Sequence, residues 1–136
     1  IPLGQRVVAP VLSRVAPKLH VKSDFDGSVL SRDVDVQQRY DNDPLRVGGS
    51  TAGLGRQILD AMKATSPVIA KITVPTYILH GEADTLVPPS ASEPIGELAN
   101  VTRKLWAGLR HECMNEPEWP EVVTGITEWL DGQVPA

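Results

Sequence analysis

The sequence predicts an α/β fold, in which parallel strands alternate with helices. Three observations in the second half of the chain support this prediction. A β-rich apolar run at 76–79 follows Pro75, and a helix is expected at 90–99. A second strand is expected at 102–106, and a strongly amphipathic helix at 118–131. The order strand, helix, strand, helix is typical of a parallel sheet with crossover helices.

The first half of the chain is predicted to consist of helices and loops. Apolar residues at helical spacing predict a helix at 5–16, which Pro17 ends. Turn-forming residues then predict a loop over 20–31. Two further helices are expected, one at about 33–40 and one at 50–65.

The first predicted strand and the last predicted helix have different patterns of apolar residues. The run at 76–79 is short and continuously apolar, as expected of a strand that is buried on both faces. The last helix has one apolar face, formed by Trp119, Val122, Val123, Ile126, Trp129 and Leu130. Two strands are too few for a stable parallel sheet, so we expect further strands of this sheet to precede Ile1.

The composition excludes several classes of protein. The chain has 136 residues, 41% of them hydrophobic, which fits one modest globular domain. The net charge of -4 argues against a nucleic acid partner, because nucleic acid favours basic faces. The sequence has no apolar run long enough to span a bilayer. We therefore expect a soluble protein, cytoplasmic or peripherally associated with a membrane.

Two polar side chains follow the predicted strands, where α/β proteins keep their active sites. Asp84 follows the strand that ends at Leu79, and His111 follows the strand that ends near Trp106. A serine hydroxyl needs a histidine to take its proton and a carboxylate to orient that histidine. Because neighbouring parallel strands end at the same sheet edge, Asp84 and His111 are predicted to share one crevice as acid and base.

Three stretches of the sequence resemble one family of enzymes. ITVPTYILHGEADTLVPPSAS (72–92) and WAGLRHECMNEPEWPEVVTGITEWL (106–130) are similar to the acid strand and the histidine loop of monoacylglycerol lipases and lysophospholipases, which are serine aminopeptidase S33-like α/β-hydrolases. LSRDVDVQQRYDNDPL (30–45) resembles their cap. The resemblance implies the C-terminal part of an α/β-hydrolase, with a cap or lid segment at 1–66 and part of the core at 67–136.

The same resemblance implies a carboxylic ester hydrolase that works by Ser-His-Asp acyl transfer. Asp84 would be the triad acid and His111 the general base, in the chain order of this fold. The family's Gly-x-Ser-x-Gly elbow and oxyanion loop are expected upstream of Ile1. This chain would then be inactive alone and would need the missing N-terminal half as a partner. The substrate would be a lipid ester, and we expect no cofactor and no metal.

One segment of the chain is similar to the Gly-x-Ser-x-Gly motif that carries the nucleophile. Gly48-Gly49-Ser50-Thr51-Ala52 is close to Gly-x-Ser-x-Gly, and Ser50, Asp84 and His111 occur in the required order. A nucleophile elbow directly follows a strand, however, and 43–47 is a poor central strand. We therefore interpret Ser50 as the N-cap of the helix at 50–65.

The remaining polar residues near the pair are given structural roles. His80 is a rival base, but we interpret it as an anchor of its turn through a backbone hydrogen bond. His20 lies in a predicted polar loop. Cys113 is too close to His111 in one loop to be its nucleophile. Two interpretations stay open for three residues beside His111, which either order the loop or are solvated surface: Glu112, Asn115 and Glu116.

Several functional alternatives stay open at this point. The helix at 5–16 could cover an acyl tunnel as a lid or touch a lipid interface directly. Peptidases, epoxide hydrolases and other esterases share the same fold ending, so the fold alone does not select the reaction. The chain could instead be a non-catalytic binding module, or a fragment that forms a homo-oligomer through an exposed sheet edge.

Overall fold

The computed structural model describes residues 12–22 and 25–134, which form two compact units. The first unit contains the described residues of Ile1–Asp24 and Leu45–Ile69, and the second contains those of Phe25–Pro44 and Ala70–Ala136. Residues 25–44 therefore pack with the C-terminal strands, although the sequence analysis grouped them with the rest of 1–66. The role of residues 1–66 as a cap stays a prediction.

The first unit is a small antiparallel ribbon followed by a long helix. Strand β1 (His20–Lys22) pairs with β2 (Gly49–Thr51), so that Val21 lies opposite Ser50. Helix α3 (Ala52–Thr65) follows directly. Of the helix predicted at 5–16, residues 12–15 are helical and the earlier residues lie outside the described part of the chain.

Two predictions for this unit were wrong in detail. The helix N-cap is Thr51 and not Ser50, because the Thr51 hydroxyl accepts a hydrogen bond from the Leu54 N–H at 3.1 Å. Ser50 is part of β2 instead, one residue before the cap. His20 lies in β1 and not in a loop, because its segment pairs with the residues around Ser50.

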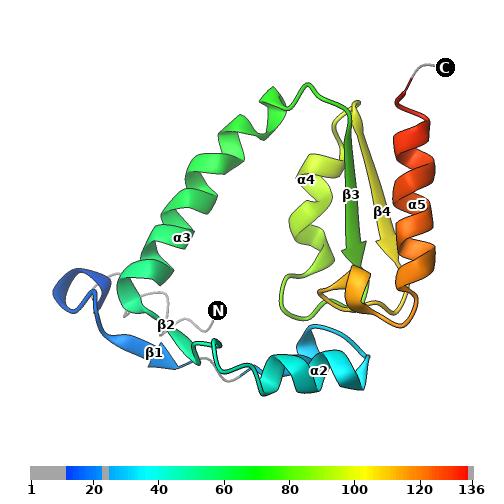
Figure 1. Ribbon diagram of the computed structural model, residues 1–136. Helices are drawn as coiled ribbons and strands as arrows, with labels where there is room; N and C mark the ends of the chain where they lie inside the picture. Colours follow the sequence, from blue (N-terminus) through cyan, green and yellow to red (C-terminus); the bar gives the residue numbers. More distant parts are fainter. Residues whose placement is uncertain (1–11, 23–24, 135–136) are drawn as a thin grey trace. The chain divides into compact units, whose positions relative to one another are not determined.

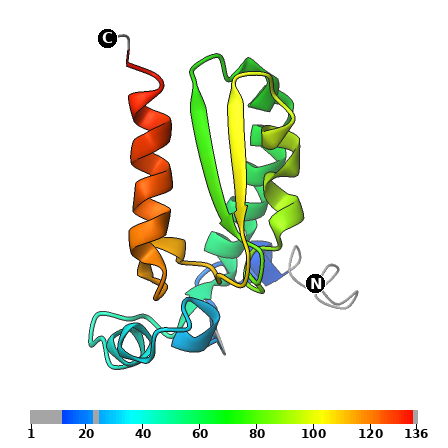
Figure 2. The ribbon, with the colours of Figure 1, turned by 90° about the vertical axis from the view of Figure 1, so that its right-hand side faces the viewer.

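The second unit is built on a parallel strand pair, as predicted. Strands β3 (Thr76–Gly81) and β4 (Val101–Trp106) pair in a register that places Gly81 opposite Trp106. Helices α4 (Glu93–Gly96) and α5 (Trp119–Asp131) lie on opposite sides of this pair, as Figure 1 and the turned view in Figure 2 show. The strand–helix–strand–helix order of the sequence analysis is therefore confirmed.

The helix predicted at 90–99 is shorter than expected. A 3-10 turn, η3 (Pro89–Ser92), precedes the single α-turn of α4. Pro94 explains the difference, because it has no N–H to bond the carbonyl of Ser90 as an α-helix would require. The Glu93 N–H bonds that carbonyl instead, with 3-10 spacing.

Segment 25–44 carries a 3-10 turn, η1 (Gly27–Val29), and helix α2 (Val34–Asp41). The predicted helix at 33–40 is thus confirmed within a residue, and Asp33 caps it through the N–H groups of its first turn. In Figure 1, α2 lies beside the C-terminal ends of β3 and β4. This segment therefore reaches the sheet edge at which α/β proteins place their functional residues.

The core of the second unit lies between α5 and the strand pair. Leu109, Cys113 and Val122 are buried, and partly buried hydrophobic residues pack against them: Leu79, Trp106 and Ile126. At the other end of α5, the Trp129 ring lies 5.5 Å from that of Tyr77. Helix α5 thus covers the sheet with part of the predicted apolar face, Val122, Ile126 and Trp129, whereas Trp119, Val123 and Leu130 of that face are exposed. Among the described residues, the helices are too short or too polar to cross a membrane.

Candidate active site

Asp84 lies in the tight turn that follows β3, with its side chain 2% exposed. Its Oδ1 accepts hydrogen bonds from the N–H groups of Leu86 at 2.8 Å and Val87 at 2.9 Å. These bonds are local, so the turn sequence itself fixes one carboxylate oxygen. The second oxygen, Oδ2, is left to face the loop that follows β4.

The surroundings of Asp84 favour its ionised form. Burial alone would raise the pKa of this carboxyl and is the largest single influence. The N–H groups of Val87 and Leu86 and the bond with His111 act in the opposite direction and together outweigh it, so that the pKa of Asp84 lies below its ordinary value. Asp84 is therefore a buried carboxylate and can hold a histidine.

His111 is brought to that carboxylate by the loop after β4. Its Nδ1 lies 2.8 Å from Asp84 Oδ2. Because the carboxylate can only accept, Nδ1 carries the proton and donates it. The His111 side chain is still 35% exposed, and its Nε2 makes no hydrogen bond to any described residue. A histidine held in this way has one ring nitrogen oriented by an acid and the other free to accept a proton.

Gly81 permits the acid turn and the base loop to approach each other. A Cβ at this position would lie 2.1 Å from the Arg110 carbonyl oxygen and 2.3 Å from that of Leu109. Two backbone bonds cross at the same place, from the Ala83 N–H to the Leu109 carbonyl and from the Glu82 N–H to the Trp106 carbonyl, both at 2.9 Å. The absence of a side chain at Gly81 is thus a condition of the Asp84–His111 contact.

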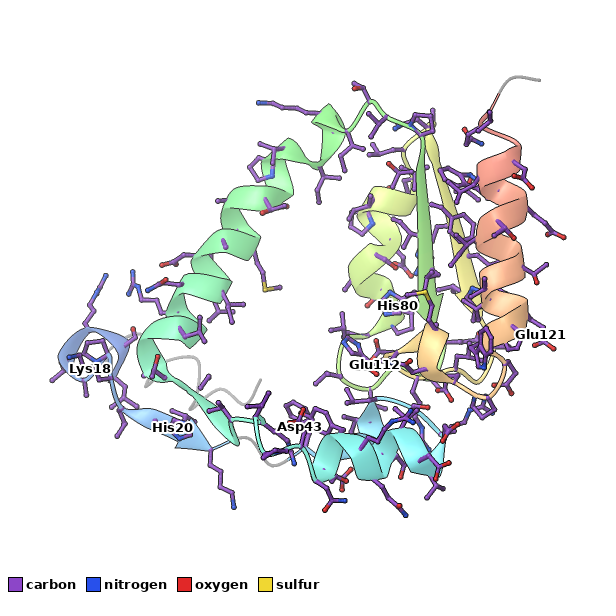
Figure 3. All side chains as sticks on the ribbon, in the orientation of Figure 1. Lys18, His20, Asp43, His80, Glu112 and Glu121 are labelled. Atoms are coloured by element: carbon purple, nitrogen blue, oxygen red, sulfur yellow. The ribbon has the colours of Figure 1, made fainter. Side chains whose placement is uncertain are left out.

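His80 anchors the acid turn, as predicted. It stands near the C-terminal end of β3 (Figure 3), and its Nε2 lies 2.9 Å from the Val87 carbonyl oxygen. Its Nδ1 lies 3.0 Å from the Ser92 hydroxyl. Nε2 is also 3.3 Å from Asp84 Oδ2, farther than the nitrogen of His111. Both ring nitrogens of His80 are occupied, so the rival base has no free nitrogen for proton transfer.

Cys113 is a packing residue of the core. It is 2% exposed, and burial raises the pKa of its thiol. A nucleophilic cysteine needs a lowered pKa and access to substrate. The environment of Cys113 therefore agrees with the structural role that the sequence analysis gave it.

For Glu116, the structure excludes solvated surface and supports the other interpretation, in which it orders the loop. Glu116 is 0% exposed. Its carboxylate accepts from the N–H of Arg110 at 2.6 Å and from the N–H of Arg32 at 2.9 Å. Asn115 is exposed, as predicted, and bonds Glu112, which lies in the loop after β4 (Figure 3).

Ser50, the other candidate group, belongs to a different unit from the pair. Ser50 belongs to β2 in the first unit, and Asp84 and His111 belong to the second. Within the described ranges, no three histidine, cysteine, aspartate or glutamate side chains cluster as metal ligands would. The structure thus brings the two predicted site residues, Asp84 and His111, into direct contact.

Most of the chain is similar in sequence to known proteins. The family model of serine aminopeptidase S33 matches residues 1–118, which include both members of the pair. A monoacylglycerol lipase of Mycolicibacterium smegmatis is 32% identical over 127 residues, covering 90% of this chain and 45% of that protein. The human monoglyceride lipase is 33% identical over 124 residues, covering 88% of this chain and 40% of that protein.

The fold has a similar counterpart among solved structures. The crystal structure of Paleococcus ferrophilus monoacylglycerol lipase matches with a TM-score of 0.85 and 30% identity, covering 98% of this chain and 54% of that one. The chain thus spans about half the length of the relatives that it matches. The two-stranded sheet and its helices correspond to part of an α/β-hydrolase.

Proposed function

The chain belongs to the serine aminopeptidase S33 family of α/β-hydrolases, and on this premise we propose that it supplies the acid and the base of a serine-dependent carboxylic ester hydrolase. The observation that carries the proposal is the 2.8 Å bond from His111 Nδ1 to the buried Asp84 carboxylate, with Nε2 left free. This is the arrangement that converts a serine hydroxyl into a nucleophile.

In this proposal His111 is the general base and Asp84 orients it. His111 Nε2 takes the proton of the attacking serine and later donates it to the leaving alcohol. Asp84 fixes the ring and stabilises the imidazolium that forms in between. The serine and the amides that hold the oxyanion come from a segment outside these 136 residues.

We propose a lipid ester, such as a monoacylglycerol or a lysophospholipid, as the substrate. The names of the relatives support this class, because the bacterial and human proteins are monoacylglycerol and monoglyceride lipases. A phospholipase of Bacillus subtilis, 29% identical over 124 residues, supports the phospholipid variant.

The proposal is tested by replacing the base in the full-length protein that carries this chain. We expect His111→Ala to lower kcat for monoacylglycerol hydrolysis by at least about 10³-fold, the loss typical of a triad member. His20→Ala is the matched control, because His20 is an exposed histidine on β1 of the first unit. Full activity after His111→Ala would exclude this base.

The origin of the serine is tested by labelling the same protein with a fluorophosphonate. The probe modifies an activated serine, and peptide mapping by mass spectrometry locates it. We expect the modified serine outside residues 1–136. Modification of Ser50, abolished by His111→Ala, would place the nucleophile within this chain and contradict our assignment.

Self-association is the second candidate. Within the described residues β3 and β4 form a sheet of their own, and open strand edges pair readily. If this edge were used between copies, sedimentation would show a dimer that a charged substitution at an exposed strand residue, such as Leu105→Lys on β4, dissociates. A monomer that hydrolyses esters would exclude this alternative.

A further inference from the structure

A buried carboxylate outside the proposed acid–base pair carries a further inference. Glu116 is fully buried, while most buried glutamates require a partner for their charge. It follows η4 (Cys113–Asn115) and precedes α5, at the end of the loop that bears His111. The proposed reaction assigns it no role.

Each oxygen of Glu116 bonds a different part of the second unit. Oε1 accepts from the Arg110 N–H at 2.6 Å. Oε2 accepts from the Arg32 N–H at 2.9 Å and from its guanidinium Nε at 3.1 Å. All of these partners are donors, which suits a deprotonated carboxylate, and the guanidinium supplies the opposite charge. Glu116 therefore joins the base loop to segment 28–32.

Both chain neighbours of His111 are held to that segment. Arg110, which precedes it, bonds Glu116 through its N–H and the Ser31 carbonyl through Nη1 at 3.1 Å. Glu112, which follows it, donates its N–H to the Leu30 carbonyl at 2.8 Å. Among the residues that the structure describes, the His111 ring bonds only Asp84. The direction of Nε2 thus depends on a backbone that Glu116 helps to fix.

We infer that Glu116 is a positioning residue for the general base. It holds the peptide before His111 so that Nε2 meets the serine at the correct distance and angle. This inference rests on the proposed function, because a base must exist in order to be positioned. Proton transfer is sensitive to such placement, and a displacement of about 1 Å is enough to lower a rate about 100-fold.

The test uses Glu116→Gln in the full-length protein. The amide has the size of the carboxylate, but its NH₂ must face an N–H donor of Arg110 or Arg32. We expect kcat to fall by about 10- to 100-fold while KM changes by less than about three-fold, because the substrate pocket keeps its residues. The far-downfield proton resonance of the His111 Nδ1–H, which reports its bond to Asp84, should shift or broaden.

Glu118→Gln is the matched control. Glu118 pairs with the same Arg32, but through Nη2, its side chain is 38% exposed, and it has no bond to Arg110. We expect its kcat and its Nδ1–H resonance to match those of the unaltered protein. A purely structural role of Glu116 would lower the melting temperature of Glu116→Gln without changing either readout below that temperature.

The outcomes separate this inference from the proposed function. Unchanged kcat and resonance in folded Glu116→Gln, together with an inactive His111→Ala, would overturn the positioning role alone. Activity retained in His111→Ala would overturn the proposed function itself. If Glu116→Gln does not fold, Glu116→Asp keeps the charge on a side chain one methylene shorter. A folded Glu116→Asp with unaltered kcat would then overturn the inference.

Discussion

Helices α3 and α5 are both amphipathic in sequence, but their apolar faces are buried to different extents in the two units. In α5 of the second unit, Val122 is 0% exposed and Ile126 packs beside it against the strand pair, while Trp119 and Leu130 are 52% and 48% exposed. In α3 of the first unit no residue is buried, and Leu54, Ile58 and Met62 are 48%, 51% and 63% exposed. The same periodicity therefore accompanies a partly covered face in one unit and, in the other, a face on which no residue is buried.

This difference shows what an amphipathic pattern can and cannot establish. The pattern marks the face that needs a partner, but the partner must come from elsewhere in the protein. The chain spans about half the length of its relatives, so a part of the fold that would cover such a face need not lie within it. The candidate site is found in the unit whose core is covered, where a buried carboxylate can hold its geometry.

The sharpest contrast between the units is expected in catalysis. Asp84→Asn keeps the shape of the side chain but removes the charge that fixes the His111 tautomer, so kcat should fall by about 10⁴-fold in the full-length enzyme. Asp60→Asn in α3 is the matched control, because Asp60 forms an exposed ion pair with Arg56 in the first unit. Steady-state ester hydrolysis of both variants checks this. Equal losses would mean that the second unit does not hold the chemistry alone.

Two glycine-to-alanine substitutions, one in each unit, are expected to change the free energy of unfolding in opposite directions. Gly81→Ala places a methyl group within 2.1 Å of the Arg110 carbonyl, so we expect a loss of about 2–4 kcal/mol in the free energy of unfolding. We also expect a fall of about 100-fold in kcat. In α3, the space around Gly55 is open, and Gly55→Ala should add about 0.5–1 kcal/mol. Urea unfolding measures both, and destabilisation of similar size would contradict the contrast.

Truncating one apolar residue in each helix sharpens the packing comparison. Val122→Ala leaves a cavity in the core and should cost about 2 kcal/mol. Leu54→Ala removes a side chain that is 48% exposed, and should cost less than half as much although it removes more atoms. Chemical denaturation of the full-length protein measures both. Equal costs would show that a segment outside the described residues covers the α3 face.

The smallest effect expected is a dependence of stability on pH. The pKa of Asp84 lies below its ordinary value in the folded protein, so its ionised form stabilises the fold. This contribution is complete above the pKa of the unfolded chain, about 3.9, and is lost as the pH falls through the folded value. The stability difference between the unaltered protein and Asp84→Asn should therefore shrink below about pH 4. A difference that is constant from neutral to acidic pH would contradict this.

The sequence was sufficient where the signals are local. The parallel pair follows from two short apolar runs with a helix after each, and the Asp84–His111 approach follows from their positions after those runs. The role of His80 was also predictable, because its anchoring bond to Val87 lies within one turn. In each case the residues that decide the structure lie within one strand–helix–strand unit of the chain.

The features that the sequence did not predict depend on residues that are far apart in the chain. In sequence Glu116 could either order its loop or lie in solvent, and its burial depends on Arg32, which lies 84 residues away. The grouping of segment 25–44 with the second unit depends on the same long-range contacts. The shift of the cap from Ser50 to Thr51 is a smaller matter, because both side chains can cap and the β1–β2 pairing decides between them.

The attachment of the base loop to segment 28–32 has a consequence for the order of folding. Asp84 and His111 are 27 residues apart, whereas Arg32 and Glu116 are 84 apart. Closing the longer loop costs more chain entropy, so its contacts are expected to form later. Asp84 and His111 would then come into contact before the bonds between Glu116 and Arg32 form. A refolding enzyme should show native strand and helix signals first and recover its activity afterwards.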